Sequence, residues 1–353
     1  MALKHADNFN IYGSGATGTS NMVDGVYADA EGTPTTDPDG ISTTLCLNLT
    51  TGSGNTRIPF RYVLQDGAVN TCGMAWRMWH SSLPNSGDQD QFRMLDGSNN
   101  EIARLSFTST GAVAVYLAGG TSYVSTVPVI TAAGWYHIEW KYTYAGVNLA
   151  SFEVRIEGIT VLAQTNVTNT GKGQIYQVGG LVGAISHFFV SYMKDLVVWD
   201  GTGTNNNDFL GSVLVTNLTP TADVSLNWTP NTGTTGYEIL DNIPPNDAQY
   251  IDAANPPPAA YVGEMSNLPA DVTSVKGLIT FVRAAKTDGG DGSLQVSLIS
   301  DPSGMPATID GANRPITVAQ TYWRDVFEVD PKTSAAWLPS AVDAARIKIN
   351  RTT

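Results

Sequence analysis

Hydrophobic and polar residues alternate along residues 134–158, and the pattern predicts two antiparallel strands. In the first run, every second residue is large and apolar, and the residues between are polar: Tyr136, Ile138, Trp140 and Tyr142 alternate with His137, Glu139 and Lys141. Residues 151–157 alternate in the same way after a turn that contains Gly146 and Asn148. Because side chains on a strand point alternately to opposite faces, we expect a hairpin with one buried face, packed on a second sheet.

Similar short strand patterns recur along much of the chain, separated by turn residues. No segment keeps a helical period for more than a turn or two, and the glycine-rich stretch 13–20 is expected to be a turn. Regularly spaced short strands are typical of a β-sandwich or barrel. The predicted strands are 9–12, 43–49, 57–64, 72–79, 102–107, 111–116, 135–143, 151–157, 159–164, 186–199, 210–216, 276–285, 293–299, 316–318, 322–329 and 345–350.

The chain has 353 residues, which favours two domains over one. The strand pattern is interrupted by loop sequence rich in Pro, Asn and Asp at 218–223 and 242–261, and it resumes at 276. We therefore predict an all-β protein in which residues 1–218 form a sandwich. Residues 219–353 are predicted to form a second, smaller β-sandwich domain with a Pro-rich entry loop.

The charge balance excludes some partners. The chain has 19 Lys and Arg against 32 Asp and Glu, a net charge of −13, and no basic run, so we expect neither nucleic-acid binding nor docking on anionic lipid. Its N-terminal residues have no apolar core of a signal peptide, and the most apolar stretch, 178–193, is too short and too interrupted to span a bilayer. We expect synthesis in a cytoplasm without export by a signal peptide and without membrane insertion.

No cofactor or metal site is predicted. Cys46 and Cys72 are expected to be small buried thiols, because no disulfide framework or zinc-ligand spacing surrounds them. Three acidic, glycine-containing loops offer oxygen atoms, at 37–40, 200–208 and 288–292. Their residues are those that tight turns require, so we expect these loops to be ordinary turns. Calcium binding by one of them is the alternative.

Catalytic residues are not predicted either. The four histidines are dispersed, and the chain has no nucleophile elbow and no phosphate-binding loop. Nearby carboxylates such as Glu153 and Glu157, or Glu238 and Asp241, have no surrounding pattern that marks a substrate groove. We therefore expect a protein that is not an enzyme, although a carboxylate pair assembled from distant segments would not be visible in the sequence.

A contact surface is predicted from loops at one rim of the sandwich. Residues 81–91 and 118–126 are polar loops, and they contribute Asp88, Asp90 and Tyr123. Trp135 begins the first alternating run on the face opposite Trp140, either as a structural rim residue or as an aromatic platform for sugar rings.

Several segments resemble known proteins. The runs "WYHIEWKYTY…FEVRIEG" and "MKDLVVWDGTG" resemble the concanavalin A-like, laminin-G-type sandwich. The segments "DNFNIYGSG", "DLVVWDGTGTNNNDFLGSVLVTNLTP" and "LNWTPN…EILDNIPPNDAQYIDA" resemble a family of tailed-bacteriophage virion structural proteins, of the tail, tail-fibre or capsid-decoration type. The resemblance extends from about residue 7 to 337.

The resemblance implies a concanavalin A-like jelly roll and a non-enzymatic structural component of a virion. It further implies a homo-oligomer that contacts other virion proteins and a host-surface glycan. The alternative is a carbohydrate-binding or glycan-degrading protein with the same fold. A self-complementary patch would favour assembly, whereas acidic residues paired on a concave face would favour the enzyme.

Overall fold

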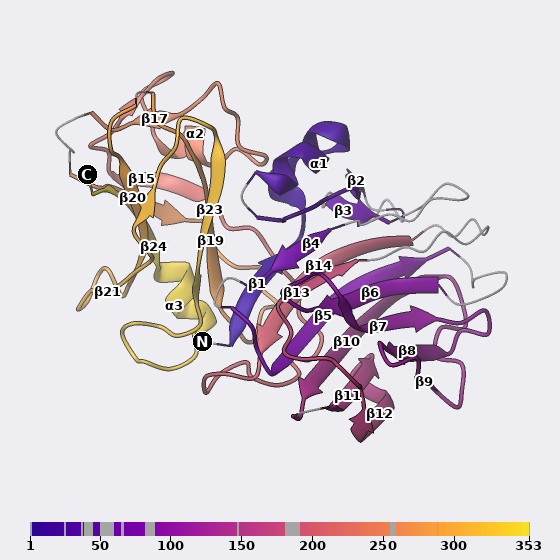
Figure 1. The fold of residues 1–353 in the computed structure, drawn as a ribbon. Coiled ribbons are helices and arrows are strands. Elements are labelled where there is room, and N and C mark those ends of the chain that lie inside the picture. Colours follow the sequence, from indigo (N-terminus) through magenta and orange to yellow (C-terminus); the bar gives the residue numbers. More distant parts are fainter. Residues whose placement is uncertain are drawn as a thin grey trace. The chain divides into compact units, whose positions relative to one another are not determined.

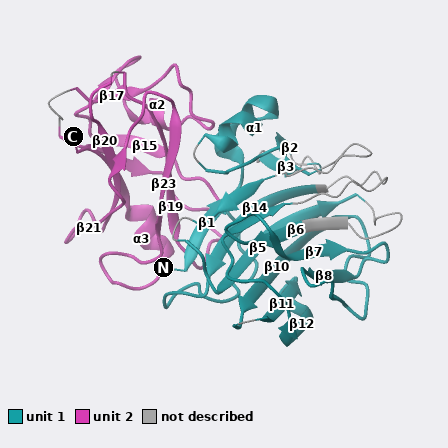
Figure 2. Ribbon diagram, viewed as in Figure 1, with its two compact units in different colours: residues 1–215 teal, residues 216–353 magenta. Residues whose placement is uncertain are grey.

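The computed structural model describes most of the chain: residues 2–24, 26–36, 38, 45–49, 60–64, 67–81, 89–146, 148–180, 191–254, 259–287 and 289–352. The chain separates into two compact units, residues 1–215 and 216–353 (Figure 2). Among the described residues, no helix is long and apolar enough to cross a membrane.

Unit 1 contains a large sheet of eight strands, which carries the candidate site. Its strands lie in the order β12-β11-β10-β5-β14-β3-β2, and β1 also pairs with β14 (Figure 1). All of these pairings are antiparallel. The strand bounds are β1 Leu3–Asp7, β2 Thr33–Thr36, β3 Leu45–Asn48, β5 Thr71–His80, β10 Gly134–Tyr144, β11 Leu149–Ile156, β12 Ile159–Thr168 and β14 Ser191–Asp200.

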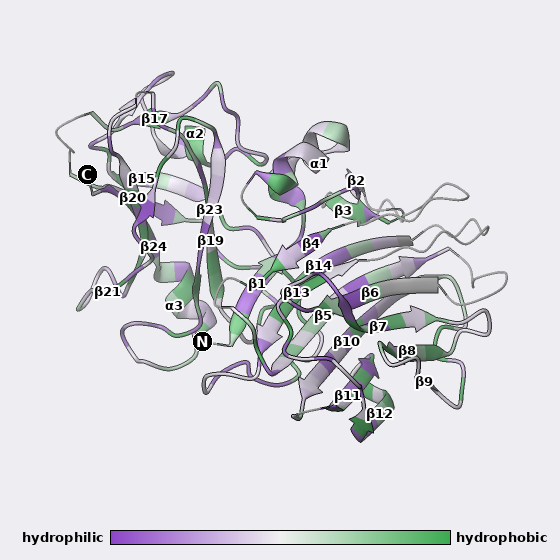
Figure 3. Ribbon diagram, viewed as in Figure 1, coloured by the Kyte–Doolittle hydropathy of each residue, from purple (hydrophilic) through white to green (hydrophobic). Residues whose placement is uncertain are grey.

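A second sheet of six strands completes the sandwich of unit 1. Its order is β4-β13-β6-β7-β8-β9, formed by Arg61–Val63, Gln177–Gly180, Gln89–Leu95, Glu101–Phe107, Val113–Leu117 and Ser122–Val124. Large side chains of the two sheets meet in the core, where the ring of Trp76 on β5 lies 3.9 Å from that of Phe92 on β6. Hydropathy accordingly varies from residue to residue along the strands (Figure 3).

The predicted hairpin is confirmed, with β10 and β11 paired so that Trp140 lies opposite Val154. Trp140 and Ile138 are fully buried on the inner face, as the alternation predicted. The opposite face is also covered at its centre, because Glu139 is only 1% exposed. The expectation of a hairpin buried on one face alone is therefore wrong at this point.

Other local predictions are wrong. The predicted strand at 9–12 is a short 3-10 helix, and residues 316–318 form no strand. Residues 210–216 form no strand and instead run across the outer face of the large sheet. The glycine-rich stretch near the N-terminus is largely helical, since α1 spans Gly15–Val23 after a short 3-10 helix, η1, at Asn10–Tyr12. Helix α1 buries Met22, and a Cβ on Gly18 would lie 2.2 Å from the carbonyl oxygen of Gly13, so close packing rather than turn chemistry accounts for that glycine.

Unit 2 is a smaller β-sandwich. A six-stranded sheet, β15-β18-β24-β20-β21 with β22 beside β20, shares core clusters with residues of the two-stranded sheet β19-β23. Its elements are β15 Pro220–Ser225, β16 Thr229–Pro230, α2 Tyr237–Leu240, β17 Ile251–Asp252, β18 Tyr261–Met265, β19 Leu278–Ala284, β20 Ser293–Ser300, β21 Ala307–Asp310, β22 Arg314–Pro315, β23 Thr321–Phe327, α3 Pro339–Ala344 and β24 Arg346–Arg351. The predicted fold class, two all-β sandwich units, is confirmed.

Candidate functional site

Three aromatic side chains form a row across the outer face of the large sheet. In the antiparallel register, Trp135 of β10 lies opposite Trp79 of β5, and Trp79 lies opposite Tyr192 of β14. The rings of Trp79 and Tyr192 meet edge to face, with centroids 5.7 Å apart. All three side chains are partly exposed. We call Trp135, Trp79 and Tyr192 the aromatic row.

The next row along the same three strands is polar. His137 of β10 lies opposite Arg77 of β5, and Arg77 lies opposite Lys194 of β14. Successive residues on one face of a strand are two positions apart, about 7 Å, so this polar row lies directly beside the aromatic row. The rows are also in contact, because Lys194 Nζ lies 4.2 Å from the ring centre of Trp135.

His137 is buried within the polar row. It is 3% exposed, and neither ring nitrogen has a hydrogen-bond partner among the described residues. Burial, together with the positive charge of Arg77, lowers the pKa of His137 to about 4 against the opposing effect of Glu157. The imidazole is therefore neutral at pH 7.

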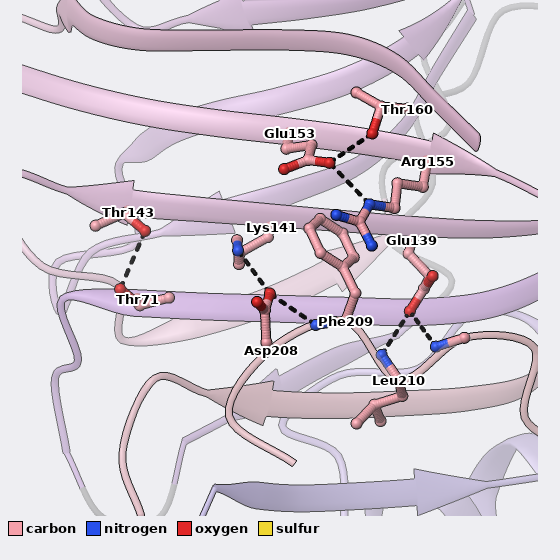
Figure 4. Close-up of polar contacts among 11 residues, drawn as sticks. Thr71, Glu139, Lys141, Thr143, Glu153, Arg155, Thr160, Asp208, Phe209 and Leu210 are labelled. Atoms are coloured by element: carbon pink, nitrogen blue, oxygen red, sulfur yellow. Dashed lines mark hydrogen bonds and ion pairs between the residues drawn. The ribbon is translucent and has the colours of Figure 1, made fainter. Parts of the chain in front are cut away.

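Residues 201–215, which we call the covering segment, cover the part of the outer face next to the polar row. Glu139 Oε1 accepts hydrogen bonds from the backbone nitrogens of Leu210 and Gly211, at 2.8 and 3.0 Å (Figure 4). Lys141 pairs with Asp208 at 2.6 Å. These contacts with β10 fix the path of the covering segment along one side of the polar row.

The covering segment then continues over β5 and β14. Ser212 Oγ accepts a hydrogen bond from Arg77, and the backbone nitrogen of Val215 donates to Asp195 Oδ1. Arg77 thus belongs to the polar row and also holds the covering segment. The Arg77 side chain nevertheless stays 29% exposed.

Phe209 anchors the covering segment on the sheet. The guanidinium carbon of Arg155 lies 3.8 Å from the centre of its ring, and Lys141 Nζ lies 4.6 Å from it (Figure 4). The same ring meets Trp199 edge to face at 6.3 Å. Trp199 is fully buried on the outer face, although that face of an ordinary sandwich sheet is solvated.

The predicted contact residues do not lie on one surface. Trp135 belongs to the aromatic row, whereas Tyr123 on β9 packs against Phe152, an inward-facing residue of β11. Asp90 lies on β6 opposite Ser106. Asp88, and with it most of the loop 81–91, lies outside the described residues.

The structure bears on the predictions made for the two cysteines and for the candidate calcium loops. Cys46 and Cys72 are buried and free, as predicted. Among the described residues, no group of three or more His, Cys, Asp or Glu side chains is placed to hold a metal ion. The candidate calcium loops 37–40 and 288–292 lie partly outside those residues, and in the third loop Asp200 Oδ1 accepts hydrogen bonds from the backbone and hydroxyl groups of Thr202.

Four residues of the two rows were not recognised from the sequence: Trp79, Arg77, Tyr192 and Lys194. A signal was present, because along β5 the aromatic and basic residues alternate with inward-facing Met74, Trp76 and Met78. The missing information was the strand order. β5 and β14 flank each other although they are more than a hundred residues apart, and only that pairing forms the rows.

No family model matches this chain, and no curated protein matches it. Solved structures do. An endo-β-1,4-glucuronan lyase from the fungus Trichoderma reesei is 12% identical over 56% of this chain and 95% of its own, with a TM-score of 0.39. The alginate lyase Aly36B is 13% identical over 55% and 95%, with a TM-score of 0.35. A tetrameric galectin from the sponge Cinachyrella sp. is 8% identical over 41% and 100%, with a TM-score of 0.31.

A sialidase is 14% identical over 56% of this chain, with a TM-score of 0.41, and the match spans only 18% of the sialidase. At such identities these similarities show a shared β-sandwich fold alone.

The expectation of a non-enzymatic virion component is contradicted and is not retained. The named structures of similar fold are polysaccharide lyases, a sialidase and a galectin, and none is a particle protein. The expectation that the chain is not an enzyme is contradicted by the same finding and is not retained either. Location in a virion, homo-oligomer formation and contact with other virion proteins or a host-surface glycan stay predictions.

Proposed function

We propose that unit 1 is a carbohydrate-binding module whose binding surface is the part of the outer face of the large sheet that carries the aromatic row and the polar row. The aromatic row carries the proposal. A sugar ring has an apolar face of C–H groups and a polar edge of hydroxyls, so it pairs well with indole and phenol rings. Trp and Tyr are also the residues that dominate recognition surfaces, because they bring large contact area with few rotatable bonds.

The construction of the face supports this assignment. Trp135, Trp79 and Tyr192 come from three neighbouring strands, so the sheet fixes their spacing before any ligand binds. A platform on strands is more rigid than one on loops, and less conformational entropy is lost on binding. The polar row beside it supplies hydrogen-bond donors from Arg77 and Lys194 for sugar hydroxyls.

A direct test is binding of soluble oligosaccharides by calorimetry to the full chain and to Trp79→Ala and Trp135→Ala variants. We expect each substitution to weaken binding at least about tenfold, as for a central aromatic contact residue. Trp323→Ala is the matched control, since Trp323 is a partly exposed tryptophan of unit 2, and it should leave binding unchanged. Equal affinity of all four proteins would refute the assignment.

Glycan degradation is a second candidate function, and His137 favours it. A buried imidazole whose pKa is shifted by burial and by the neighbouring Arg77 is the kind of perturbed group that gathers at catalytic sites. Degradation predicts new reducing ends from the oligosaccharide that binds, and loss of that release in His137→Gln with binding retained. If the wild-type chain binds the oligosaccharide but releases no new reducing ends, the degradation function is excluded and only the binding function is supported.

A further inference from the structure

The covering segment lies on a part of the sheet that has its own aromatic and polar groups. They are the ring of Trp199, the carboxylate of Glu139 and the amine of Lys141. Gly73, the register partner of Lys141 and Trp199, has no side chain. The indole of Trp199 occupies the space above it, since a Cβ on Gly73 would lie 2.1 Å from an indole carbon. We call Gly73, Glu139, Lys141 and Trp199 the covered surface.

The covered surface continues the candidate site along the strands. The outer-face residues of β10 follow one another at intervals of two positions, in the order Trp135, His137, Glu139 and Lys141. At about 3.4 Å per residue, Lys141 lies roughly 20 Å along the strand from the aromatic row. Aromatic and polar groups thus occur in both halves of this stretch of the face, and the covering segment occupies one half.

Two polar groups of the covered surface make incomplete hydrogen bonds. Glu139 Oε2 and Trp199 Nε1 are buried, and neither atom has a hydrogen-bond partner among the described residues. Burial also raises the pKa of Glu139, against the effect of its hydrogen bonds from the backbone of Leu210 and Gly211. Because a buried polar group without a hydrogen bond costs free energy, these two atoms disfavour the covered arrangement.

Few residues of the covering segment are buried. Leu210 is the only buried residue between positions 201 and 215. Asp208, which pairs with Lys141, has a side chain that is 66% exposed. The hydrogen bond between Arg77 and Ser212 is exposed as well. Exposed ion pairs contribute little to stability, and segments with few buried apolar contacts open locally at less cost than core strands.

We propose that the covering segment is a displaceable strap, and that a long glycan binds the aromatic row and the covered surface together when the strap is lifted. This inference rests on the proposed function. In the closed state Phe209 meets the ring of Trp199, where a sugar ring would stack in the open state. A short glycan reaches only the aromatic row. A long glycan gains the covered surface only in molecules whose strap is open, so its apparent affinity depends on the open fraction.

The first test needs no ligand. Hydrogen exchange in the full chain compares the backbone amides of Leu210 and Gly211 with that of Trp140 in the core of β10. We expect the two strap amides to exchange at least about 100-fold faster, through local opening. Phe209→Ala should speed their exchange about a further tenfold, because it removes the ring that packs on the sheet. Phe281→Ala, at a partly exposed phenylalanine of unit 2, is the matched control and should leave it unchanged.

The second test measures what the strap covers. Calorimetry gives the affinity of the wild-type chain and of Phe209→Ala for cellotriose and cellohexaose, a short and a long oligosaccharide with the same backbone. We expect Phe209→Ala to bind cellohexaose about tenfold more tightly than the wild type does, because its open fraction is larger. Both proteins should bind cellotriose equally. Thermal melts establish that the variant is folded.

The outcomes distinguish this inference from the proposed function. Strap amides that exchange as slowly as that of Trp140 would show that the covering segment leaves the sheet only when unit 1 unfolds, and would overturn the inference. No gain for cellohexaose in Phe209→Ala, or an equal gain for both lengths, would also overturn it. Faster exchange together with a gain for cellohexaose alone supports it. Carbohydrate binding itself is judged separately, by whether Trp79→Ala and Trp135→Ala weaken binding of an oligosaccharide in the wild-type strap.

Discussion

Glu139 on the large sheet holds Leu210 in the covering segment, with Glu139 Oε1 2.8 Å from the Leu210 backbone nitrogen. The two residues are 71 positions apart in the chain. The alternation predicts that this side of β10 is solvated. The covering segment, which comes later in the chain and forms no strand, covers it instead. Glu139 is the next residue after His137 on the outer face of β10. The covering segment therefore lies directly beside the polar row and bounds the candidate site on that side.

Removing this carboxylate should loosen the covering segment. Glu139→Ala leaves the backbone N–H groups of Leu210 and Gly211 without their acceptor, and we expect a loss of about 2–4 kcal/mol in unfolding free energy. Glu139→Gln keeps an acceptor oxygen and should cost less. Denaturant unfolding gives both values, and hydrogen exchange should show faster exchange at the amides of residues 210 and 211. Unchanged exchange in Glu139→Ala would contradict the role of the carboxylate.

Gly73 on β5 lies under the Trp199 ring, and this contact should tolerate no side chain. A Cβ at Gly73 would lie 2.1 Å from an indole carbon of Trp199. We expect Gly73→Ala to cost about 1–3 kcal/mol by overpacking and to displace Trp199 and Phe209 above it. Thermal unfolding and tryptophan fluorescence report the two effects. Gly173→Ala is the control, since its Cβ would meet no atom within 4 Å, and similar losses in both variants would argue against the contact.

Alternation was sufficient to predict the all-β fold and the inner face of the β10–β11 hairpin. The period of two identifies which side chains share a face, and burial of Ile138 and Trp140 needs no further information. Helix α1 was not predictable in this way, because Gly15–Val23 has a weak apolar pattern and buries only Gly18 and Met22. Its helical form is set by packing rather than by its own sequence.

The candidate site was less predictable for a different reason. Trp135 was recognised, but Trp79 and Tyr192 become its neighbours only through the pairing of β10, β5 and β14. Register between strands far apart in sequence is set by the whole sandwich and is not encoded in any one run. The covering segment likewise has apolar residues such as Leu210 and Val213 that suggest a strand, yet its backbone donors bond to side chains of the sheet.

Trp140 should be among the most costly residues of unit 1 to truncate. It is fully buried between the sheets, so Trp140→Ala is expected to lower the unfolding free energy by ~3–5 kcal/mol. Glu153→Ala, on the outer face of the same hairpin, removes partly exposed contacts with Arg155 and Thr160 (Figure 4) and should cost at most about 1 kcal/mol. Chemical denaturation of the two variants checks this, and the reverse order would invert the assignment of faces.

Two buried histidines should make stability depend on pH below neutrality. Burial lowers the pKa of His80 to about 3, and burial together with Arg77 lowers that of His137 to about 4, from an ordinary value of 6.5. Between pH 6.5 and these values the unfolded chain binds protons that the folded chain does not. Stability should therefore be full above about pH 6.5 and fall as pH drops to 4 for His137 and to 3 for His80.

Each histidine should contribute a slope of at most about 1.4 kcal/mol per pH unit within its window. Denaturant unfolding at a series of pH values gives the total slope, which also includes the carboxylates. His137→Gln removes one titrating group, so its slope between pH 6 and 4.5 should be shallower than that of the wild type, with little difference between pH 7 and 8. Nuclear magnetic resonance titration of the imidazole provides the direct measurement. A His137 that titrates near pH 6.5 in the folded protein would show that its ring is hydrated and would contradict the predicted contribution of His137 to the pH dependence of stability.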